Sequence, residues 1–463
     1  MRSSTCAGPN RREFLRFGSV AVAGLGAGVS PFSLKAGQLP SKTTNDPAVI
    51  FIWLPGGPPH QDTFDMKPDA PAEFRGDFRP IKTNVPGIDI CEHMPALAKC
   101  ADKYSIVRSI AHTFADHGGG HKKFLTGRDP LQPAGFVNDY PMAGSMATKL
   151  LGGMHNGLPN YVNIVDGGRQ DIDTFSFGSA YLGHSTHPFT LAGDPSDLAF
   201  GVKNLSVLAG SESKIADRRT LLNAFDRPMP HDTTGIARGM DTSRDRAFHL
   251  MTSAAAKDAF DHRKEDPKVR DRYGDHRYGQ RCLMARRLVE AGVQWVTVVL
   301  ENATPRGGEM IKDGTYNWDS HAVNCDIFKD TKHKLGYFDR AISALLEDLY
   351  DRGLDKRVQV VVTGEFGRTP RIEYDKATGR PGRDHWPQAM SLLVSGGGAK
   401  MGQVIGSTTS KAETPKDRPM TPNHLWATVF KHLKVDYKNA SFPGEGGRPM
   451  PMLTDGEPIA ELV

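Results

Sequence analysis

The chain alternates between short unbroken apolar runs and longer stretches in which apolar residues recur every three or four positions. The short runs are typical of strands buried on both faces of a sheet. They cover residues 48–54, 105–107, 294–300, 358–363 and 391–395. The longer stretches are typical of helices that bury one side. They cover residues 95–103, 280–291, 335–349 and 425–433. This alternation predicts an α/β fold with a mostly parallel central sheet and helices on both faces.

The first 36 residues differ from the rest of the chain and predict an export signal. Arg11 and Arg12 form a twin-arginine pattern, and the uncharged residues 17–32 follow it. This run has about 16 residues, whereas ~20 are needed to cross a bilayer, so we expect a signal peptide over 1–36 and no stable membrane span. Retention of the segment as a membrane anchor is the alternative. The signal implies transport by the twin-arginine translocase to the periplasm or outside the cell.

Residues 37–463 are expected to form one large domain. Within it, residues 189–268 are polar, mixed in charge and without a clear period, and they predict an insertion of helices and long loops. The chain has 58 basic and 53 acidic residues, a net charge of +5, of which the first 36 residues contribute +4. The domain is therefore nearly neutral, which argues against nucleic acid as a partner.

The cysteines do not have the spacing of a structural zinc site. Cys6 lies in the predicted signal, and the other four are Cys91, Cys100, Cys282 and Cys325. In an oxidising compartment these four could form disulfides, with Cys91 and Cys100 the closest in sequence. The alternative is four buried free thiols.

Two candidate sites lie in the first third of the domain. Asp62 follows the first predicted strand and a glycine turn, which would bring its carboxylate to the carboxyl edge of the sheet, where ligands of parallel sheets bind. A plain solvated turn is the alternative. Residues 112–121 contain three histidines and a triple glycine, and Arg128 follows. Imidazoles favour a metal, whereas glycine amides and an arginine favour an anion; a surface cluster without a role is the third interpretation.

Further acids and imidazoles occur close to later strands. Asp319 and His321 are two positions apart, so on an extended segment they would point to the same side. Glu365 follows the strand at 358–363, and His385 precedes the strand at 391–395. Several such motifs at one edge of a sheet fit a two-metal site better than unrelated loops.

The order of these motifs resembles the alkaline phosphatase and sulfatase superfamily. The closer resemblance is to a branch that is exported by the twin-arginine route, is common in planctomycetes and has no established reaction. The segments that carry it are 56–58, 62–65, 84–88, 116–119, 285–290, 364–370 and 384–387. The resemblance implies an alkaline phosphatase-like fold and divalent ions, zinc, manganese or calcium, two of them by analogy. It implies that one ion is held by Asp319, His321 and His385, and the other by Asp62 and Glu365.

The chain also departs from that superfamily. The position at which sulfatases carry the cysteine that becomes formylglycine holds His117, and the sequence C-x-P-S-R is absent, which excludes a formylglycine sulfatase. Phe366 follows the acidic ligand where sulfatases have a histidine, and His117 or His121 could replace that missing ligand. Thr113 is the nearby upstream hydroxyl and a candidate nucleophile.

These features predict an exported metal-dependent hydrolase of phosphate or sulfate esters, acting on a small molecule or a polysaccharide. Two ions would polarise the ester and supply hydroxide, with His117 at the nucleophile position and Arg128 neutralising the charge on the oxyanion. The alternative is a catalytically silent protein that retains the metal and binds anionic glycans.

Overall fold

The computed structural model describes residues 46–152, 154–155, 157–167, 176–202, 217, 220–221, 248–444 and 447–463. The chain divides into two units, Met1–Lys42 and Thr43–Val463, and the described residues belong to the second. The predicted signal peptide, 1–36, and much of the predicted insertion, 189–268, lie outside the described residues. In the described part of the chain, no helix has the length and apolar character needed to cross a membrane.

An eight-stranded sheet forms the centre of the second unit, in the order β16-β4-β15-β10-β1-β9-β7-β8. Its strands are β1 (Ala48–Trp53), β4 (Tyr104–Ile110), β7 (Tyr161–Val165), β8 (Phe189–Ala192), β9 (Trp295–Val299), β10 (Val358–Thr363), β15 (Met390–Gly396) and β16 (Val404–Ile405). β1 pairs in parallel with both β9 and β10, and β7 and β8 continue in the same direction. Only β15 runs against its neighbours within this sheet. The predicted mostly parallel sheet is confirmed.

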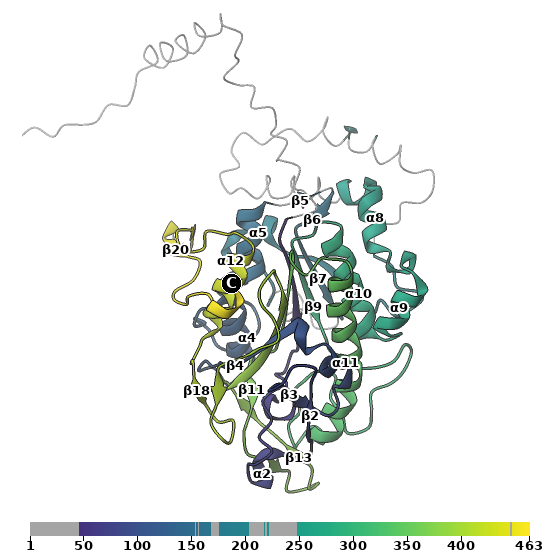
Figure 1. Ribbon diagram of the computed structural model, residues 1–463. Helices are drawn as coiled ribbons and strands as arrows, with labels where there is room; N and C mark the ends of the chain where they lie inside the picture. Colours follow the sequence, from purple (N-terminus) through teal and green to yellow (C-terminus); the bar gives the residue numbers. More distant parts are fainter. Residues whose placement is uncertain are drawn as a thin grey trace, which may run out of the picture. The chain divides into compact units, whose positions relative to one another are not determined.

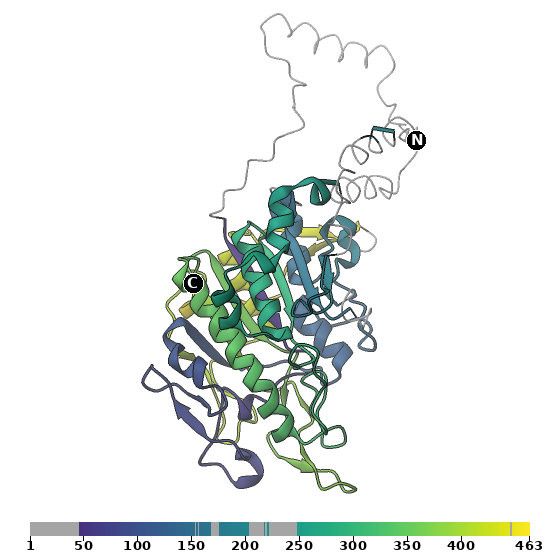
Figure 2. The same cartoon turned by 90° about the vertical axis from the view of Figure 1, so that its right-hand side faces the viewer.

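Alternate residues of β1 face two separate cores, as the period of a strand requires. Ile50 and Ile52 pack in a core with α10 (Arg277–Glu290) and α11 (Ile327–Asp351). Phe51 and Trp53 pack in a second core on the opposite face with α4 (His117–Thr126), α5 (Ala143–Leu151) and α12 (Pro422–His432). Figure 1 shows these two helical layers on either side of the sheet, and Figure 2 views the molecule from the side of the long green α11. Helices on both faces are therefore confirmed as well.

The remaining elements are short. Among the described residues the other α-helices are α2 (Ala72–Arg75), α3 (Pro95–Lys99), α4, α5, α8 (Ala254–Phe260), α9 (Pro267–Tyr273) and α12. Two-stranded ribbons are formed by β2 (Pro80–Lys82) and β3 (Asp89–Cys91), β5 (Met154–His155) and β6 (Leu158–Pro159), β11 (Gly367–Arg368) and β14 (His385–Trp386), β12 (Glu373–Tyr374) and β13 (Pro381–Gly382), β17 (Ser407–Thr408) and β18 (Pro415–Asp417), and β19 (Ser441–Pro443) and β20 (Pro449–Pro451).

Two sequence-based expectations change in the structure. The segment 189–268, expected as helices and loops, begins with β8, which pairs with β7 at the edge of the main sheet. The strand was not predicted because β8 is only partly buried and lacks the continuous apolar run of the other strands. The four cysteines of the domain are buried free thiols, so the open question of pairing is answered for them.

Candidate metal centre

The loop that follows β1 is pressed against two other loops at the carboxyl edge of the sheet. Gly56 and Gly57 have φ values of 104° and 81°, which favour glycine. A Cβ at Gly56 would lie 2.4 Å from the amide nitrogen of Asp319, and one at Gly57 would lie 2.6 Å from the carbonyl oxygen of Phe366. Gly56 also donates its N–H to Oε1 of Glu365 at 2.8 Å. The two glycines thus bring the segments around Asp319 and Glu365 together.

A first group of potential ligands consists of His117, Asp319, His321 and His385, which offer ligand atoms within 4.8 Å of one another. Oδ1 of Asp319 lies 2.8 Å from Nε2 of His321 and 3.0 Å from Nε2 of His385. Oδ2 of Asp319 lies 3.1 Å from Nε2 of His117. Each of the four side chains is partly exposed, so this group, called here the outer group, is accessible to solvent and to a substrate.

Hydrogen bonds fix the rings of two histidines in the outer group. Nδ1 of His385 lies 2.6 Å from the carbonyl oxygen of Ala115, which can only accept, so Nδ1 carries the proton. Nδ1 of His321 lies 2.5 Å from the carboxylate of Asp384 and donates in the same way. In the neutral rings both Nε2 atoms then hold lone pairs, yet they lie 2.9 Å apart. Histidines that bind metals are oriented by the same kind of bond from the other nitrogen.

A second group, called here the inner group, consists of His117, His121 and Glu365. Oε1 of Glu365 lies 2.8 Å from Nδ1 of His117 and 3.3 Å from Nε2 of His121. The side chains of His121 and Glu365 are 2% and 0% exposed. Within the described part of the chain, Oε2 of Glu365 is buried and has no hydrogen-bond partner. A buried carboxylate oxygen without a partner is costly, and a cation at this position would satisfy it.

The carboxylates of both groups are ionised. Burial alone would raise the pKa of Asp319, but a hydrogen bond from His117, the neighbouring rings of His321 and His385 and the charge of Arg368 hold it far below its usual range. Burial likewise opposes ionisation of Glu365, and His121 and His117 lower its pKa well below normal. Burial disfavours protonation of His117, yet its hydrogen bonds to Asp319 and Glu365 outweigh this and raise its pKa to about 9. A protonated His117 therefore balances part of the negative charge when no cation does.

Arg368 holds the outer group in place, a role that the sequence did not reveal. This fully buried guanidinium donates to Oδ1 of Asp319 at 2.8 Å and to the carbonyl oxygens of Gly57 and Trp318 at 2.9 and 3.0 Å. Arg368 lies in β11, so these bonds connect the loop after β1 and the loop before α11 to the ribbon of β11 and β14. The sequence feature that could have indicated this role is the position of Arg368 within the segment 364–370, three residues after Glu365.

Asp62 lies outside both groups, in contrast to its predicted role as a ligand. It ends a 3-10 turn (His60–Asp62), is fully buried, and accepts from Nε and Nη2 of Arg383 at 2.9 and 3.3 Å. Arg383 also donates to the carbonyl oxygen of Phe74 at 2.9 Å. Because the guanidinium engages both carboxylate oxygens, this pair joins loops that are distant in sequence and leaves Asp62 no free oxygen for an ion.

The glycines at the start of α4 have a packing role. The segment forms a helix, with Oδ1 of Asp116 accepting from the N–H of Gly119 at 2.7 Å. A Cβ at Gly118 would lie 2.5 Å from the carbonyl oxygen of Pro133, and one at Gly120 would lie 2.9 Å from the ring of Phe366. Because these glycines have no side chain, α4 packs closely against Pro133 and Phe366. This packing places His117 and His121 beside Glu365.

No hydrogen bond or ion pair joins Thr113 or Arg128 to either group in the described structure. Arg128 donates to the carbonyl oxygen of Pro451 and lies over the ring of Tyr140, with 5.2 Å to its centroid. Thr113 is exposed. The structure thus brings together six of the nine predicted site residues, which are His117, His121, Asp319, His321, Glu365 and His385.

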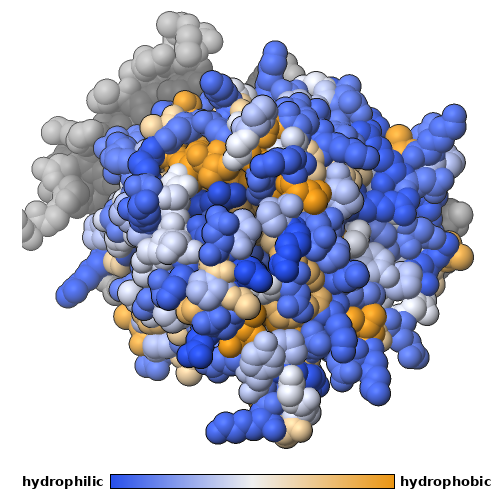
Figure 3. Space-filling model, turned by 60° about the horizontal axis from the view of Figure 1, so that its bottom comes forward, coloured by the Kyte–Doolittle hydropathy of each residue, from blue (hydrophilic) through white to orange (hydrophobic). Residues whose placement is uncertain are grey.

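Figure 3 brings forward the end of the molecule that carries α2 and β13, and this face is mainly hydrophilic with separate hydrophobic groups.

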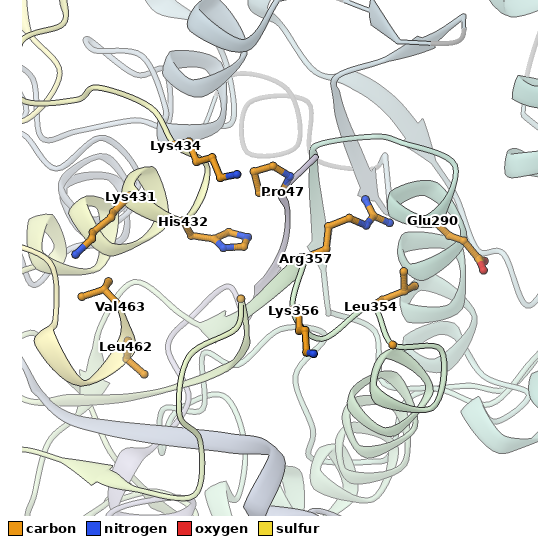
Figure 4. Close-up of a pocket in the computed structure, with 12 residues that line it drawn as sticks. Pro47, Glu290, Leu354, Lys356, Arg357, Lys431, His432, Lys434, Leu462 and Val463 are labelled. Atoms are coloured by element: carbon orange, nitrogen blue, oxygen red, sulfur yellow. The ribbon is translucent and has the colours of Figure 1, made fainter. Parts of the chain in front are cut away.

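A cavity of about 700 Å³ lies at the opposite, amino edge of the sheet (Figure 4). It is lined by residues next to the starts of β1 and β10 and the ends of three helices, including Pro47, Glu290, Lys356, Lys431 and Lys434. Its lysines are exposed and have no ion pair within the described part of the chain. No group of potential metal ligands was found there among those residues.

Fold and site together define an α/β protein with a histidine and carboxylate centre at the carboxyl edge of its sheet. The family described as "Protein of unknown function (DUF1501)" matches residues 46–463, so the chain belongs to this family. No protein of curated function matches the sequence.

Several solved structures are remotely similar. A phosphonate monoester hydrolase from Silicibacter pomeroyi has 12% identity and a TM-score of 0.37, over 89% of this chain and 76% of that one. The PsFucS1 sulfatase from Pseudoalteromonas sp. has 12% identity and a TM-score of 0.36, over 93% and 73%. A mutant of TAB5 alkaline phosphatase with bound Mg has 10% identity and a TM-score of 0.34, over 85% and 99%. At these scores the likeness is remote, and the function proposed below rests on the side chains of this chain.

Proposed function

We propose that this protein is a metal-dependent hydrolase of phosphate or sulfate esters. The observation that carries the proposal is the outer group, in which three imidazoles and one carboxylate converge at the carboxyl edge of a parallel sheet. Nitrogen and oxygen donors in this number fit zinc, and manganese is the next choice; calcium, which takes six to eight oxygens, fits less well. The inner group is the candidate site for a second ion.

The chain's own residues supply the remaining functions. Bound ions would polarise the ester oxygens and lower the pKa of water toward ~7. Arg368 keeps Asp319 ionised, and Asp384 and the carbonyl of Ala115 hold the rings of His321 and His385 in their orientation. The partial exposure of the outer group leaves room for an ester to approach. In the described structure no serine or threonine hydroxyl forms a hydrogen bond with the side chains of either group, and that of Ser320 is directed to Asp330. We therefore assign the attack to water.

Export belongs to the same proposal. The twin-arginine pattern at Arg11 and Arg12 supports transport by the twin-arginine translocase to the periplasm or beyond. An exported hydrolase would meet small esters or polysaccharides that carry phosphate or sulfate.

A second candidate function is a catalytically silent metal protein that binds anionic glycans. The placement of Thr113 and Arg128 favours it, because neither the candidate nucleophile nor the candidate oxyanion ligand contacts the centre. The two functions share the metal and differ in turnover.

The test combines metal content with a panel of esters. Protein purified without chelator should contain zinc or manganese and should hydrolyse an aryl phosphate, an aryl phosphonate or an aryl sulfate. Folded protein that takes up less than about a tenth of an equivalent of any divalent metal would exclude both candidates. Bound metal with no turnover above that of His385→Ala on every ester would leave the binding protein.

A further inference from the structure

His117 is the one residue that the two groups share among the described residues. Its Nδ1 lies 2.8 Å from Oε1 of Glu365 in the inner group, and its Nε2 lies 3.1 Å from Oδ2 of Asp319 in the outer group. The other two rings of the outer group each use Nδ1 for a partner outside it, the carbonyl of Ala115 for His385 and the carboxylate of Asp384 for His321. Only the ring of His117 therefore directs both nitrogens into the centre.

The surroundings hold this ring in place. His117 is the first residue of α4, and the helix is fixed by Asp116 and by the close packing of its glycines. Its ring lies 4.3 Å from that of His385 and 5.6 Å from that of Phe366, measured between centroids. Turning the ring would break its contacts with Glu365 and Asp319 on both sides. Its two-sided orientation is a property of the fold.

We propose that His117 bridges two divalent ions as an imidazolate. One ion would be held by Asp319, His321 and His385, and the other by Glu365 and His121. The proposal rests on the metal binding proposed above and goes beyond it in assigning the bridge. When the second ion binds, it takes the place of the remaining N–H proton of the ring, and that proton passes to the solvent.

A bridging imidazolate sets the distance between the ions. With metal–nitrogen bonds of ~2.0–2.1 Å on either side of the ring, the ions would be about 6 Å apart. Two-metal hydrolases that clamp one substrate oxygen hold their ions ~3.5–4 Å apart. Ions at the larger distance cannot share an oxygen, so the two have separate tasks. The partly exposed outer ion would meet the ester, and the inner ion, behind the buried His121 and Glu365, would fix the position of the bridge.

The test uses the whole protein loaded with zinc for stoichiometry and with copper(II) for electron paramagnetic resonance. Copper(II) suits imidazole ligands and is paramagnetic. We expect two zinc ions per chain, and a copper spectrum of two exchange-coupled ions about 6 Å apart, the span of a ring with two bonds. His117→Ala should bind a single ion, because the outer group keeps three ligands and the inner group keeps two, and the coupling should disappear. His112→Gln is the matched control, since His112 lies in the same segment and belongs to neither group. The hydrogen bonds of its ring go to backbone atoms, the carbonyl oxygen of Glu365 at 2.6 Å and the N–H of Phe114 at 3.2 Å.

The outcomes separate the bridge from the proposed function. Two uncoupled ions, two ions about 4 Å apart as in an oxygen-bridged pair, or a single ion in the unsubstituted protein would each overturn the bridge and leave a metal-dependent hydrolase standing. Two coupled ions in His117→Ala would overturn it too. Absence of any bound metal would overturn both. The spectrum of the unsubstituted protein decides the matter even where a variant fails to fold.

Discussion

The two edges of the central sheet differ in what they offer a ligand. The amino edge has the 700 Å³ cavity, lined by Lys356 after α11 and by Lys431 and Lys434 at the end of α12, where basic side chains complement the negative end of the helix. The carboxyl edge has imidazoles and carboxylates in mutual contact, among them a buried oxygen of Glu365 without a partner. The cavity at the amino edge has no group of potential metal ligands among the described residues, whereas the carboxyl edge brings two such groups together. Convergence of ligands, and not the presence of a cavity, therefore selects the candidate site.

The strongest test of this comparison removes one ligand from the carboxyl edge. His385→Ala should lower zinc affinity by more than about 100-fold, because even the partners of metal ligands contribute ~10–100-fold. Ester turnover should fall by about 10,000-fold, since the ion supplies several kcal/mol of stabilisation to the transition state. Metal analysis and ester kinetics measure both effects. Lys434→Ala at the amino edge is the control and should change neither; equal losses in the two variants would contradict the comparison.

The buried pair of Asp62 and Arg383 predicts a large effect on stability and none on metal stoichiometry. Arg383→Ala leaves the fully buried carboxylate of Asp62 unpaired, which should lower the free energy of unfolding by ~3–5 kcal/mol. Urea denaturation of the metal-free protein measures this loss. The double variant with Asp62→Ala should recover part of it, because the stranded charge is then removed. A loss of one bound ion in folded Asp62→Ala would restore Asp62 as a ligand.

The fate of Asp62 shows what a sequence reveals of such a site. Strands β1 and β10 and helix α11 follow from strong local periodicity, and His117 and Glu365 could be placed at one edge because parallel strands end together. His385 precedes β15 and lies at the same edge because β15 runs antiparallel to its neighbours. The position of Asp62 after β1 gave the same signal. Its partner, Arg383, is 321 residues away in the sequence. No local pattern could indicate that this guanidinium, and not an ion, binds the carboxylate.

Helix α4 and Arg368 escaped prediction for related reasons. Three consecutive glycines oppose a helix by their intrinsic preference, and the tertiary contacts of Gly118 and Gly120 override it. Arg368 acts on Asp319 from another loop, so its role becomes visible only when the loops are brought together. Pairings between distant loops are the part of the site that local patterns cannot contain.

The pH dependence of the metal-free and the metal-loaded protein should have opposite signs. His117 has a folded pKa of about 9 against an ordinary value of 6.5, so its protonated form stabilises the metal-free protein fully below pH 6.5, and this contribution is lost as the pH rises through 9. An ion must displace that proton, so zinc affinity should rise about tenfold per pH unit between pH 7 and 9. Melting temperatures with and without chelator from pH 6 to 10 measure both trends. His117→Gln should remove them, and parallel curves in the unsubstituted protein would contradict the assignment.

The smallest effect is expected at the amino edge itself. Lys431 lies in the last turn of α12 and Lys434 just beyond it, both exposed, where a cation near a helix end contributes ~0.3–1 kcal/mol at low salt. Lys431→Ala and Lys434→Ala together should therefore lower the free energy of unfolding by less than about 2 kcal/mol, and salt should weaken the effect. Metal content and ester turnover should stay unchanged, because neither lysine contacts the centre. Denaturation at two ionic strengths measures the difference. If the double variant lost ester turnover while keeping its metal, the amino edge would be part of the substrate's path, and the division of tasks between the two edges would have to be abandoned.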